Sequence, residues 1–530
     1  MPDPVVRDLC ENLRRIASRR FDFAAYDRRR MFAPHVLLDL APLGIFGMHV
    51  PKDLGGCGMS FEQMVQIEQQ LAAIDVTLAA FVGIHNALGL YPILVHGTEE
   101  QKKALHRYAQ GHALLGLALT EPKAGSDPAA IATVAEACGD DEWRLFGNKL
   151  WIGNAGWAQA LIVISRLSGA NGDKGKFVAF LVPTDRDGID IGAESATLGL
   201  RGIVQNHVRL DGVIVRAQDM LGQPGQGMEV ANTAMQLGRL GIGAISIGAL
   251  KRVLQMALLF TTRRQIAARP LADRLAVKAA LRDCDTEIFF FEAVLTFLAR
   301  RMDSNRSLPE YFAVALKIVS TERAWRWADF AVQIVGGRGY DEANQLARIL
   351  RDVRVLRIFE GPTEALQAYL GTSLLFGFRS IREAIQTIGG DSEPACKAVR
   401  DIESARTETL AWLKSANPRL SKRLVEAAGL FLGDFVSWRL SALIYTLSGA
   451  EGLPRSVEHL LQQSEAAWRG WLRTDYEELA LWDSTGLLDT LSEGIGHFQL
   501  PQGDEFMAPD GLLQARGVSG TPLDTSPRSK

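Results

Sequence analysis

The chain has no cysteine pattern that would indicate a metal site or a disulfide framework. Its cysteines lie far apart, and no two of them have the two-residue separation of a zinc or redox motif. We therefore expect no bound metal, and buried free thiols in a reducing compartment, at the five positions Cys10, Cys57, Cys138, Cys284 and Cys396.

The chain also has no excess of charge and no long apolar run. Its 58 Lys and Arg stand against 61 Asp and Glu, and no basic cluster indicates a nucleic-acid partner. The longest apolar segments, Leu240–Leu250 and Ile288–Ala299, are shorter than the ~20 residues that a membrane-spanning helix needs. Because the first residues are charged and include no secretory apolar stretch, we expect a cytoplasmic protein that does not span a membrane.

Hydrophobic periodicity divides the 530 residues into four domains and a tail. Apolar residues recur at three- and four-residue steps in the first, third and fourth domains, which predicts helices, whereas the second contains short β-like runs separated by turns. The predicted fold class is therefore α+β and multidomain. The boundaries are 1–115 for an N-terminal helical domain, 116–226 for a small antiparallel β-barrel or sandwich, 227–376 for a four-helix bundle, 391–500 for an additional helical domain, and 501–530 for a flexible tail.

The sharpest local signal is LALTEPKAGSD at residues 117–127. Thr120 and Ser126 offer hydroxyl groups, and Ala124 and Gly125 are small enough to let a bulky ligand touch the backbone. The same composition fits a polar turn between two strands. The chemistry of this segment alone therefore leaves a ligand site and a plain turn equally open.

Four further segments combine Gly, Trp, Arg and Glu at defined spacing. Taken singly, each has an ordinary structural explanation, because a Trp fills a core, a glycine cluster makes a turn and a Glu caps a helix. Their order along the chain gives them weight. They are GNKLWIGNAG (147–156), LGRLGIGAISIGALKRVL (237–254), RQIAARPL (264–271) and QIVGGRGYDEANQLARILRDVRVLRIFEGP (333–362).

Together the five segments resemble the signatures of the acyl-CoA dehydrogenase family, over residues ~20–375. The segment RDVRVLRIFEG and the helical C-terminal extension are most similar to the very-long-chain branch. That resemblance implies FAD as the cofactor. In the branch the extension helps to attach the enzyme to a membrane. Here the apolar stripe from Leu424 to Tyr445 lacks a basic face and is better explained as bundle core, and membrane association through this domain is the less favoured alternative.

The resemblance places one group of flavin contacts in the β domain. Thr120 would hydrogen-bond the isoalloxazine edge, and Ser126 would reach the FAD pyrophosphate and border the substrate. Trp151 would cover one face of the ring system, where an indole supplies stacking area. The backbone at Leu119 and Gly125 would lie along the flavin and the acyl chain.

A second group of flavin contacts would come from a neighbouring subunit. Arg264 would pair with the FAD pyrophosphate, a role that suits a guanidinium. Gln333, Gly336 and Gly337 would contact the same pyrophosphate across a subunit interface. The resemblance therefore implies a homodimer or a tetramer.

The resemblance assigns the chemistry to Glu360, which would remove the α-proton of a fatty acyl thioester while a hydride leaves the β-carbon. The backbone of Glu360 and Gly361 would hold the thioester carbonyl, as an oxyanion hole does. Some branches carry the base immediately before the residue that matches Arg239, which itself would border the substrate. Here that position is Gly238, so Glu360 is the one candidate base.

Several positions depart from the family pattern. Gly153 stands where relatives have a Thr or Ser directed at the flavin, and Ala267 and Ala268 replace a Phe-Gly pair near the adenosine half. Pro362 replaces a Thr, which alters the surroundings of Thr363, a further candidate contact to the ADP side. These departures indicate a divergent member with a specialised substrate.

The predicted function is FAD-dependent conversion of acyl-CoA to trans-2-enoyl-CoA, as in fatty acid β-oxidation, with an electron-transfer flavoprotein as acceptor. One alternative is the same chemistry on an acyl group bound to a carrier protein. Another is a non-catalytic scaffold or assembly factor, and a flavin monooxygenase or oxidase is a third. Retention of Glu360 favours the dehydrogenase.

Overall fold

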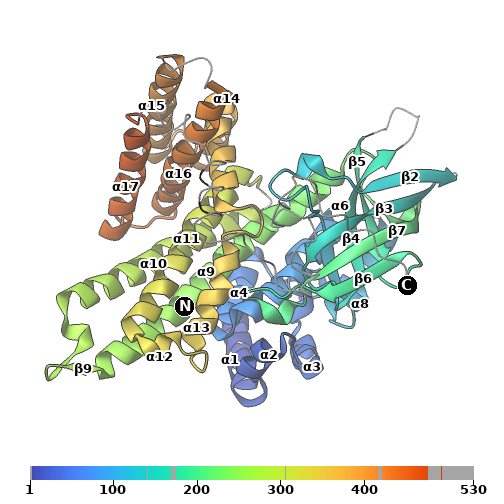
Figure 1. The fold of residues 1–530 in the computed structure, drawn as a ribbon, viewed down its shortest axis with the longest axis horizontal. Coiled ribbons are helices and arrows are strands. Elements are labelled where there is room, and N and C mark those ends of the chain that lie inside the picture. The colour runs from blue at the N-terminus through green and yellow to red at the C-terminus, as the bar shows by residue number, and fades with distance from the viewer. Residues whose placement is uncertain are drawn as a thin grey trace. The chain divides into compact units, whose positions relative to one another are not determined.

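The computed structural model describes residues 3–139, 141–168, 175–304, 306–415 and 421–474, and the single residues Leu487 and Leu491. The described residues up to Leu472 form one compact unit. The order of this unit is helices, a sheet, a helical bundle and further helices (Figure 1). The predicted α+β class is confirmed, and the predicted tail lies outside the described residues.

The N-terminal region is helical. Helix α4 begins with a capping box, in which Ser60 accepts a hydrogen bond from the N–H of Gln63 at 3.1 Å and the Gln63 side chain accepts one from the N–H of Ser60 at 3.0 Å. The α-helices are α1 (Pro4–Arg20), α2 (Phe23–Arg29), α3 (Pro34–Leu40), α4 (Phe61–Ile74), α5 (Val76–Gly83), α6 (Tyr91–His96), α7 (Glu99–Lys103) and α8 (Leu105–Ala109), with the π-helical η4 (Ile84–Leu90) between α5 and α6.

The central sheet has the strand order β6-β7-β3-β2-β4-β5-β8, and β1 pairs with β4. Two pairings, β1 with β4 and β2 with β4, are parallel, so the sheet is mixed rather than wholly antiparallel. One edge of β3 pairs with β2 and the other with β7, so β4 pairs with the free edge of β2 instead of with β3, and it runs parallel to β2 there. The strands are β1 (Leu114–Ala118), β2 (Val134–Gly139), β3 (Glu142–Ile152), β4 (Ala158–Ser168), β5 (Phe177–Pro183), β6 (Ile189–Glu194), β7 (Asn206–Arg216) and β8 (Met220–Leu221).

Helix α9 is the central element of the bundle, because it packs against α4, α10 and α11. Its interior residues are buried on nearly all sides, as expected for a helix without a polar face. Glycines permit the close contact: a Cβ added at Gly248 would lie 2.2 Å from the carbonyl oxygen of Gln69. The bundle elements are α9 (Gly227–Arg263), the hairpin β9 (Gln265–Ile266) and β10 (Arg269–Pro270), α10 (Leu275–Asp303), α11 (Glu310–Val335), α12 (Gly337–Tyr340), α13 (Gln345–Leu356) and α14 (Thr363–Gly389).

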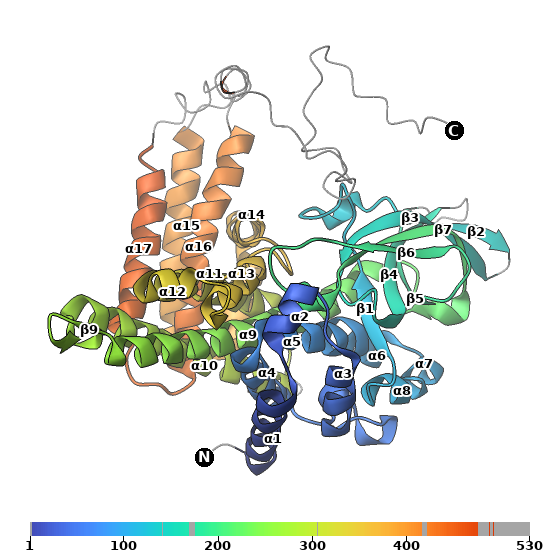
Figure 2. The same ribbon diagram turned by 60° about the horizontal axis from the view of Figure 1, so that its bottom comes forward.

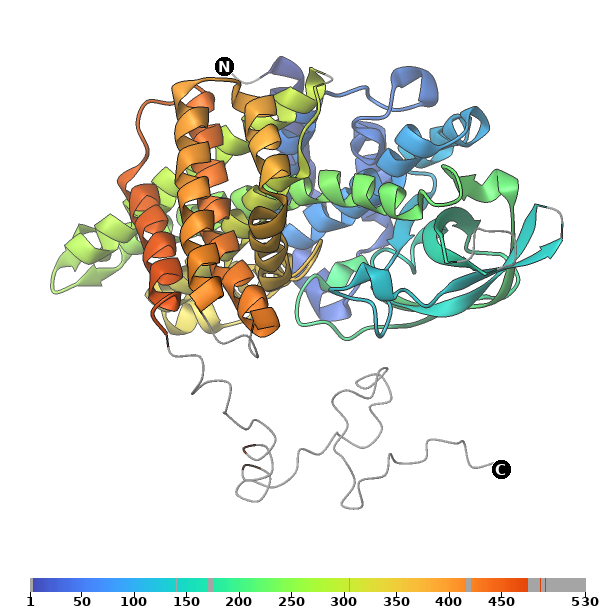
Figure 3. The same ribbon diagram turned by 90° about the horizontal axis from the view of Figure 1, so that it is seen from above.

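Three more helices lie against the bundle: α15 (Glu393–Ser415), α16 (Ser421–Leu447) and α17 (Arg455–Trp471) (Figures 2 and 3). Helix α16 packs closely on α14, since a Cβ at Gly433 would lie 1.9 Å from the carbonyl oxygen of Gln367. The predicted apolar stripe is buried at Leu424 and Tyr445, while Phe431 within it is 37% exposed. The stripe is therefore mainly core.

Two predictions from composition are wrong. By length and apolar composition, three helical segments could cross a membrane: Val76–His96, Gly227–Arg263 and Lys422–Leu447. The estimate from uninterrupted apolar runs missed these segments because isolated polar residues interrupt each run. In the fold, at least 67% of the most apolar part of each segment is buried. The cysteines are free thiols, but Cys284 alone is buried and Cys138, near the end of β2, is exposed.

Candidate active site

Glu360 lies in a strained turn between α13 and α14. Its φ is +54° and that of Gly361 is +99°, both in the left-handed region, which an L side chain adopts only at a cost. The preceding helix is fixed to the rest of the fold through Asp352, whose carboxylate accepts a hydrogen bond from the N–H of Leu200 at 2.7 Å. Arg351 adds a second anchor, an ion pair to Asp27.

Two basic side chains hold the carbonyl oxygens of this turn, and burial lowers the pKa of one of them, Lys317, to about 7. Arg239 of α9 donates from Nε to the carbonyl of Glu360 at 3.3 Å. Lys317 of α11, which is fully buried, donates from Nζ to the carbonyl of Gly361 at 2.6 Å and to that of Arg357 at 3.3 Å. The two contacts stabilise a backbone conformation that the Glu360 side chain itself disfavours.

The Glu360 carboxyl group lies against the backbone of α9. A Cβ added at Gly238 would come within 3.1 Å of Glu360 Cδ and 3.1 Å of a methyl group of Leu88. Burial raises the pKa of Glu360 to about 7, although the charges of Arg239 and Lys317 oppose that rise. The absence of a side chain at Gly238 therefore leaves the space that the Glu360 carboxyl group occupies.

The predicted flavin loop after β1 is held by a buried ion pair. Lys149 of β3 donates to Glu121 at 2.7 Å and to the carbonyl of Ile164 at 2.7 Å, and Glu121 also accepts from Thr133. Burial lowers the pKa of Lys149 to about 8. Burial also disfavours the charged form of Glu121, but Lys149 outweighs it, and the pKa of Glu121 lies below its usual value.

The next part of the predicted flavin site presents an exposed indole. Trp151 is 48% exposed and has a φ of +52°. The following turn is fixed by Asn154, whose amide donates to the carbonyl of Phe81 at 3.0 Å. A Cβ added at Gly153 would lie 2.7 Å from Ile84 Cδ1, so a Thr or Ser at this position would require the end of the Ile84 side chain to shift.

The predicted cofactor residues lie on two parts of the fold, the β domain and the bundle. The β-domain group consists of Leu119, Thr120, Gly125, Ser126, Trp151 and Gly153. The bundle group is exposed and consists of Arg264, which directly precedes β9, and of Gln333, Gly336 and Gly337 at the junction of α11 and α12. In Figures 1 and 2, β9 and α12 lie on the side of the bundle away from the sheet. Within one chain the two groups do not meet.

Thr363 does not present its hydroxyl to a ligand. The residue is 3% exposed, and its hydroxyl donates to Glu322 at 2.7 Å. A cofactor contact through that oxygen would require this bond to break. Arg239 and Gly361, in contrast, lie at the Glu360 turn as expected.

Sequence reasoning missed Lys317, Leu88 and the role of the Lys149–Glu121 pair. Lys317 carried a usable signal, since it is the single charged residue in the apolar segment AVALKIV (313–319). A cation in such a segment must find buried acceptors. Leu88 gave no signal, because its contact with α9 depends on helix packing.

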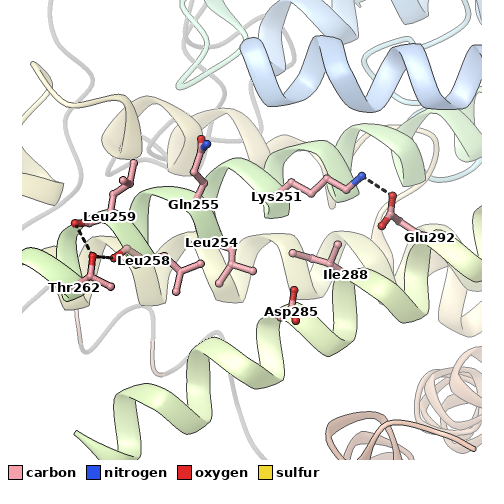
Figure 4. A pocket seen from close by; sticks show the side chains of 9 residues that line it. All are labelled: Lys251, Leu254, Gln255, Leu258, Leu259, Thr262, Asp285, Ile288 and Glu292. Carbon is pink, nitrogen blue, oxygen red and sulfur yellow. Dashed lines mark hydrogen bonds and ion pairs between the residues drawn. The ribbon is translucent and has the colours of Figure 1, made fainter. Parts of the chain in front are cut away.

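A separate hollow of about 490 Å³ lies between α9 and α10, where Lys251 pairs with Glu292 (Figure 4). Lys251 is thirteen residues beyond Gly238 on α9, which corresponds to about 20 Å along the helix. This hollow is therefore not part of the site around Glu360.

Three domain models of one family match the chain in order. The N-terminal domain of acyl-CoA dehydrogenase matches residues 5–112, its middle domain residues 116–213 and its C-terminal domain residues 225–375. The mitochondrial very long-chain specific acyl-CoA dehydrogenase of Rattus norvegicus is 32% identical over 356 residues, which are 66% of this chain and 54% of that protein. The chain thus spans about half the length of the curated relatives it matches.

Solved structures agree with the domain models. Butyryl-CoA dehydrogenase from Megasphaera elsdenii has a TM-score of 0.67 at 25% identity and covers 71% of this chain and 99% of its own. An acyl-CoA dehydrogenase from Bacillus anthracis, at 22% identity, has the same fold over 94% of this chain and 92% of its own, with a TM-score of 0.73. The domain models and the sequence identity show that this chain belongs to the acyl-CoA dehydrogenase family.

Proposed function

We propose that the chain is an FAD-dependent acyl-CoA dehydrogenase that converts a fatty acyl-CoA to the trans-2-enoyl-CoA. The observation that carries the proposal is the position of Glu360. Its carboxyl group lies beside Gly238, on a turn held by Arg239 and Lys317, and burial raises its pKa to about 7. A general base works best when its pKa is close to the working pH.

Glu360 and its neighbours have different roles in the proposed reaction. Glu360, which is partly buried, takes the α-proton onto its carboxylate. Its backbone N–H donates to the thioester carbonyl and stabilises the charge that develops there. Arg239 and Lys317 hold the two carbonyl oxygens of the turn, so that the carboxylate and this N–H keep their relative positions.

FAD, when bound, supplies the acceptor for the β-hydride. The β-domain group fits this cofactor, since Trp151 offers a half-exposed indole and a Cβ added at Gly125 would meet no atom within 4 Å. Among the described residues, the hydroxyls of Thr120 and Ser126 have no hydrogen-bond partner. The buried Lys149–Glu121 pair would hold this loop in place.

The bundle group supports a second proposal, that the active form is a homodimer or a tetramer. Arg264, Gln333, Gly336 and Gly337 are exposed and far from the β-domain group of the same chain. They would serve a cofactor held mainly by another copy. Light scattering should show an assembly larger than one chain, and a flavin-loaded monomer would contradict the proposal.

The deciding assay supplies purified, flavin-loaded protein with a series of acyl-CoAs and an artificial electron acceptor. Bleaching of the flavin and formation of the enoyl product would support the proposal. Glu364→Gln is a suitable control for Glu360→Gln, because Glu364 is exposed and lies close to the turn that carries Glu360. The same acyl groups on a carrier protein form a second arm. Use of the carrier-bound form alone would overturn acyl-CoA as the substrate and keep the chemistry.

Electron transfer onward forms a last arm of this assay. We propose an electron-transfer flavoprotein as the acceptor. It should reoxidise the reduced protein faster than dioxygen does, and equal rates would contradict this partner.

A further inference from the structure

A second buried carboxyl group lies close to Glu360 and has no partner. Glu68 of α4 is 0% exposed, and neither of its carboxyl oxygens has a hydrogen-bond partner among the described residues. Leaving such a group unpaired in an interior costs about 1–3 kcal/mol. The proposed reaction makes no use of it.

Glu68 is within reach of the reacting end of the substrate. A Cβ added at Gly241 of α9 would lie 3.1 Å from Glu68 Oε2, and one at Gly238, one helical turn earlier, 3.1 Å from Glu360 Cδ. Since Cβ atoms three positions apart on a helix are ~5–6 Å apart, the two carboxyl groups are separated by no more than about 12 Å. An extended chain covers about 1.2 Å per bond, so an acyl chain of about ten bonds spans this distance.

Residues of α5 and η4 border both carboxyl groups. Gly83, Ile84 and Leu88 remain partly exposed, whereas His85, Asn86 and Ala87 between them are buried. Leu88 borders Gly238 and Glu360, and Ile84 borders Gly153 beside the predicted flavin site. At the other end, a Cβ added at Gly83 would lie 3.8 Å from Glu68 Oε1. Gly83, Ile84 and Leu88 therefore extend from the surroundings of Glu360 to those of Glu68.

We propose that Glu68 binds a hydroxyl group on the acyl chain, so that the enzyme selects hydroxylated acyl thioesters over unsubstituted ones. The inference rests on the proposed dehydrogenase function and adds a substrate class to it. A carboxyl group and a hydroxyl can each donate and accept, which matches the two unpaired oxygens of Glu68. A site built to bind a hydroxyl discriminates strongly against the analogue that lacks it.

The charge of the site favours a neutral partner. Burial raises the pKa of Glu68 to about 8, so the carboxyl group is mostly protonated at neutral pH and can donate a hydrogen bond. An ammonium group would have to leave water for a region in which its one partner is this acid, a costly transfer. A substrate carboxylate would face a second acid. A hydroxyl avoids both penalties.

The test compares pairs of acyl-CoAs of equal length, with and without a terminal hydroxyl, from six to twelve carbon atoms. The rate of flavin reduction after anaerobic mixing gives kcat/KM for each pair. For the wild-type protein, we expect a preference for the hydroxylated substrate at one length of roughly 10- to 100-fold. Equal use of both forms at every length would overturn the proposal.

Variants separate recognition from stability. Glu68→Gln keeps a donor and an acceptor and should retain most of the preference, whereas Glu68→Leu should reverse it. The melting temperature of Glu68→Leu should not fall, since the change removes an unpaired polar group. Ser246→Ala is the matched control, because Ser246 is also buried and unpaired and lies on α9, beyond Gly243 on the side of α10 and α11. It should leave the preference unchanged.

The outcomes distinguish the two proposals. If unsubstituted acyl-CoAs reduce the flavin well and Glu68→Leu does not alter the ratio, the role of Glu68 is refuted and the dehydrogenase stands. If neither form reduces the flavin, the dehydrogenase function fails, and the role of Glu68 fails with it. If Glu68→Leu does not fold, Glu68→Met takes its place. The ratio of kcat/KM for hydroxylated and unsubstituted substrates in the wild-type protein tests the proposal without any variant.

Discussion

Replacement of Lys317 by Met removes the cation that holds the Glu360 turn. The variant leaves the carbonyl of Gly361 without its donor at 2.6 Å. An unpaired buried acceptor costs about 1–3 kcal/mol. If that cost falls on the productive position of Glu360, flavin reduction slows by roughly 5- to 150-fold. Some of the loss would come from the position of the carboxylate and some from its charge state.

The charge state gives the more specific signal. The charge of Lys317 lowers the pKa of Glu360, and burial lowers the pKa of Lys317 itself to about 7. Removal of Lys317 should therefore raise the pKa of Glu360 above 7, most clearly in the pH range where Lys317 is protonated. Because the base acts deprotonated, the rate rises with pH through this pKa. The midpoint of the pH–rate profile in Lys317→Met should therefore move to higher pH, and much of the lost rate should return in alkaline buffer.

The assay is anaerobic rapid mixing of flavin-loaded protein with acyl-CoA over a range of pH. Lys251→Met is the matched control, since Lys251 also pairs with a carboxylate on the bundle but lies about 20 Å along α9 from the turn. An unchanged midpoint and a normal rate in Lys317→Met would refute the reasoning. A lower yield of folded protein with an unchanged midpoint would mean that Lys317 acts on stability alone.

Three further predictions concern single positions and pH. Gly238→Ala should slow reduction and leave flavin bound, because its Cβ would press on the Glu360 carboxyl group at 3.1 Å; normal rates would contradict this. Ala268→Gly should stabilise the protein by about 0.5 kcal/mol or more in thermal unfolding, since Ala268 has a φ of +58°. Burial raises the pKa of Glu68 from 4.5 to about 8 and that of Glu360 from 4.5 to about 7. Between the unfolded value of 4.5 and these native values, the native state binds more protons than the unfolded state. The free energy of unfolding in denaturant should therefore fall from pH 5 to pH 8, and fall less in Glu68→Leu.

The sequence predicted best what depends on local motifs. The order of helices, sheet and bundle followed from periodicity. The family signatures gave the Thr120–Ser126 loop, Trp151 and Glu360, each of which the fold places where a ligand could reach it. Such motifs are readable because their residues act through neighbours that are close in the chain.

Contacts that depend on packing between distant segments could not be predicted from the sequence. The parallel pairing of β4 with β2 is set by which edge of β3 is already occupied. The bond from Thr363 to Glu322 joins residues 41 positions apart, and the contacts of Glu68 join α4 to α9. Neither the burial of Glu68 nor the exposure of Cys138 follows from the residue type.

The role of Glu360 is tested most directly by Glu360→Gln, which keeps the size and hydrogen bonding of the side chain and removes its basicity. The measurement is flavin reduction after anaerobic mixing with acyl-CoA, alongside flavin content and substrate binding followed by the flavin spectrum. We predict that the variant binds flavin and substrate and that reduction slows by about 10²–10⁴-fold or more. Reduction at the wild-type rate would contradict the assignment of Glu360 as the base.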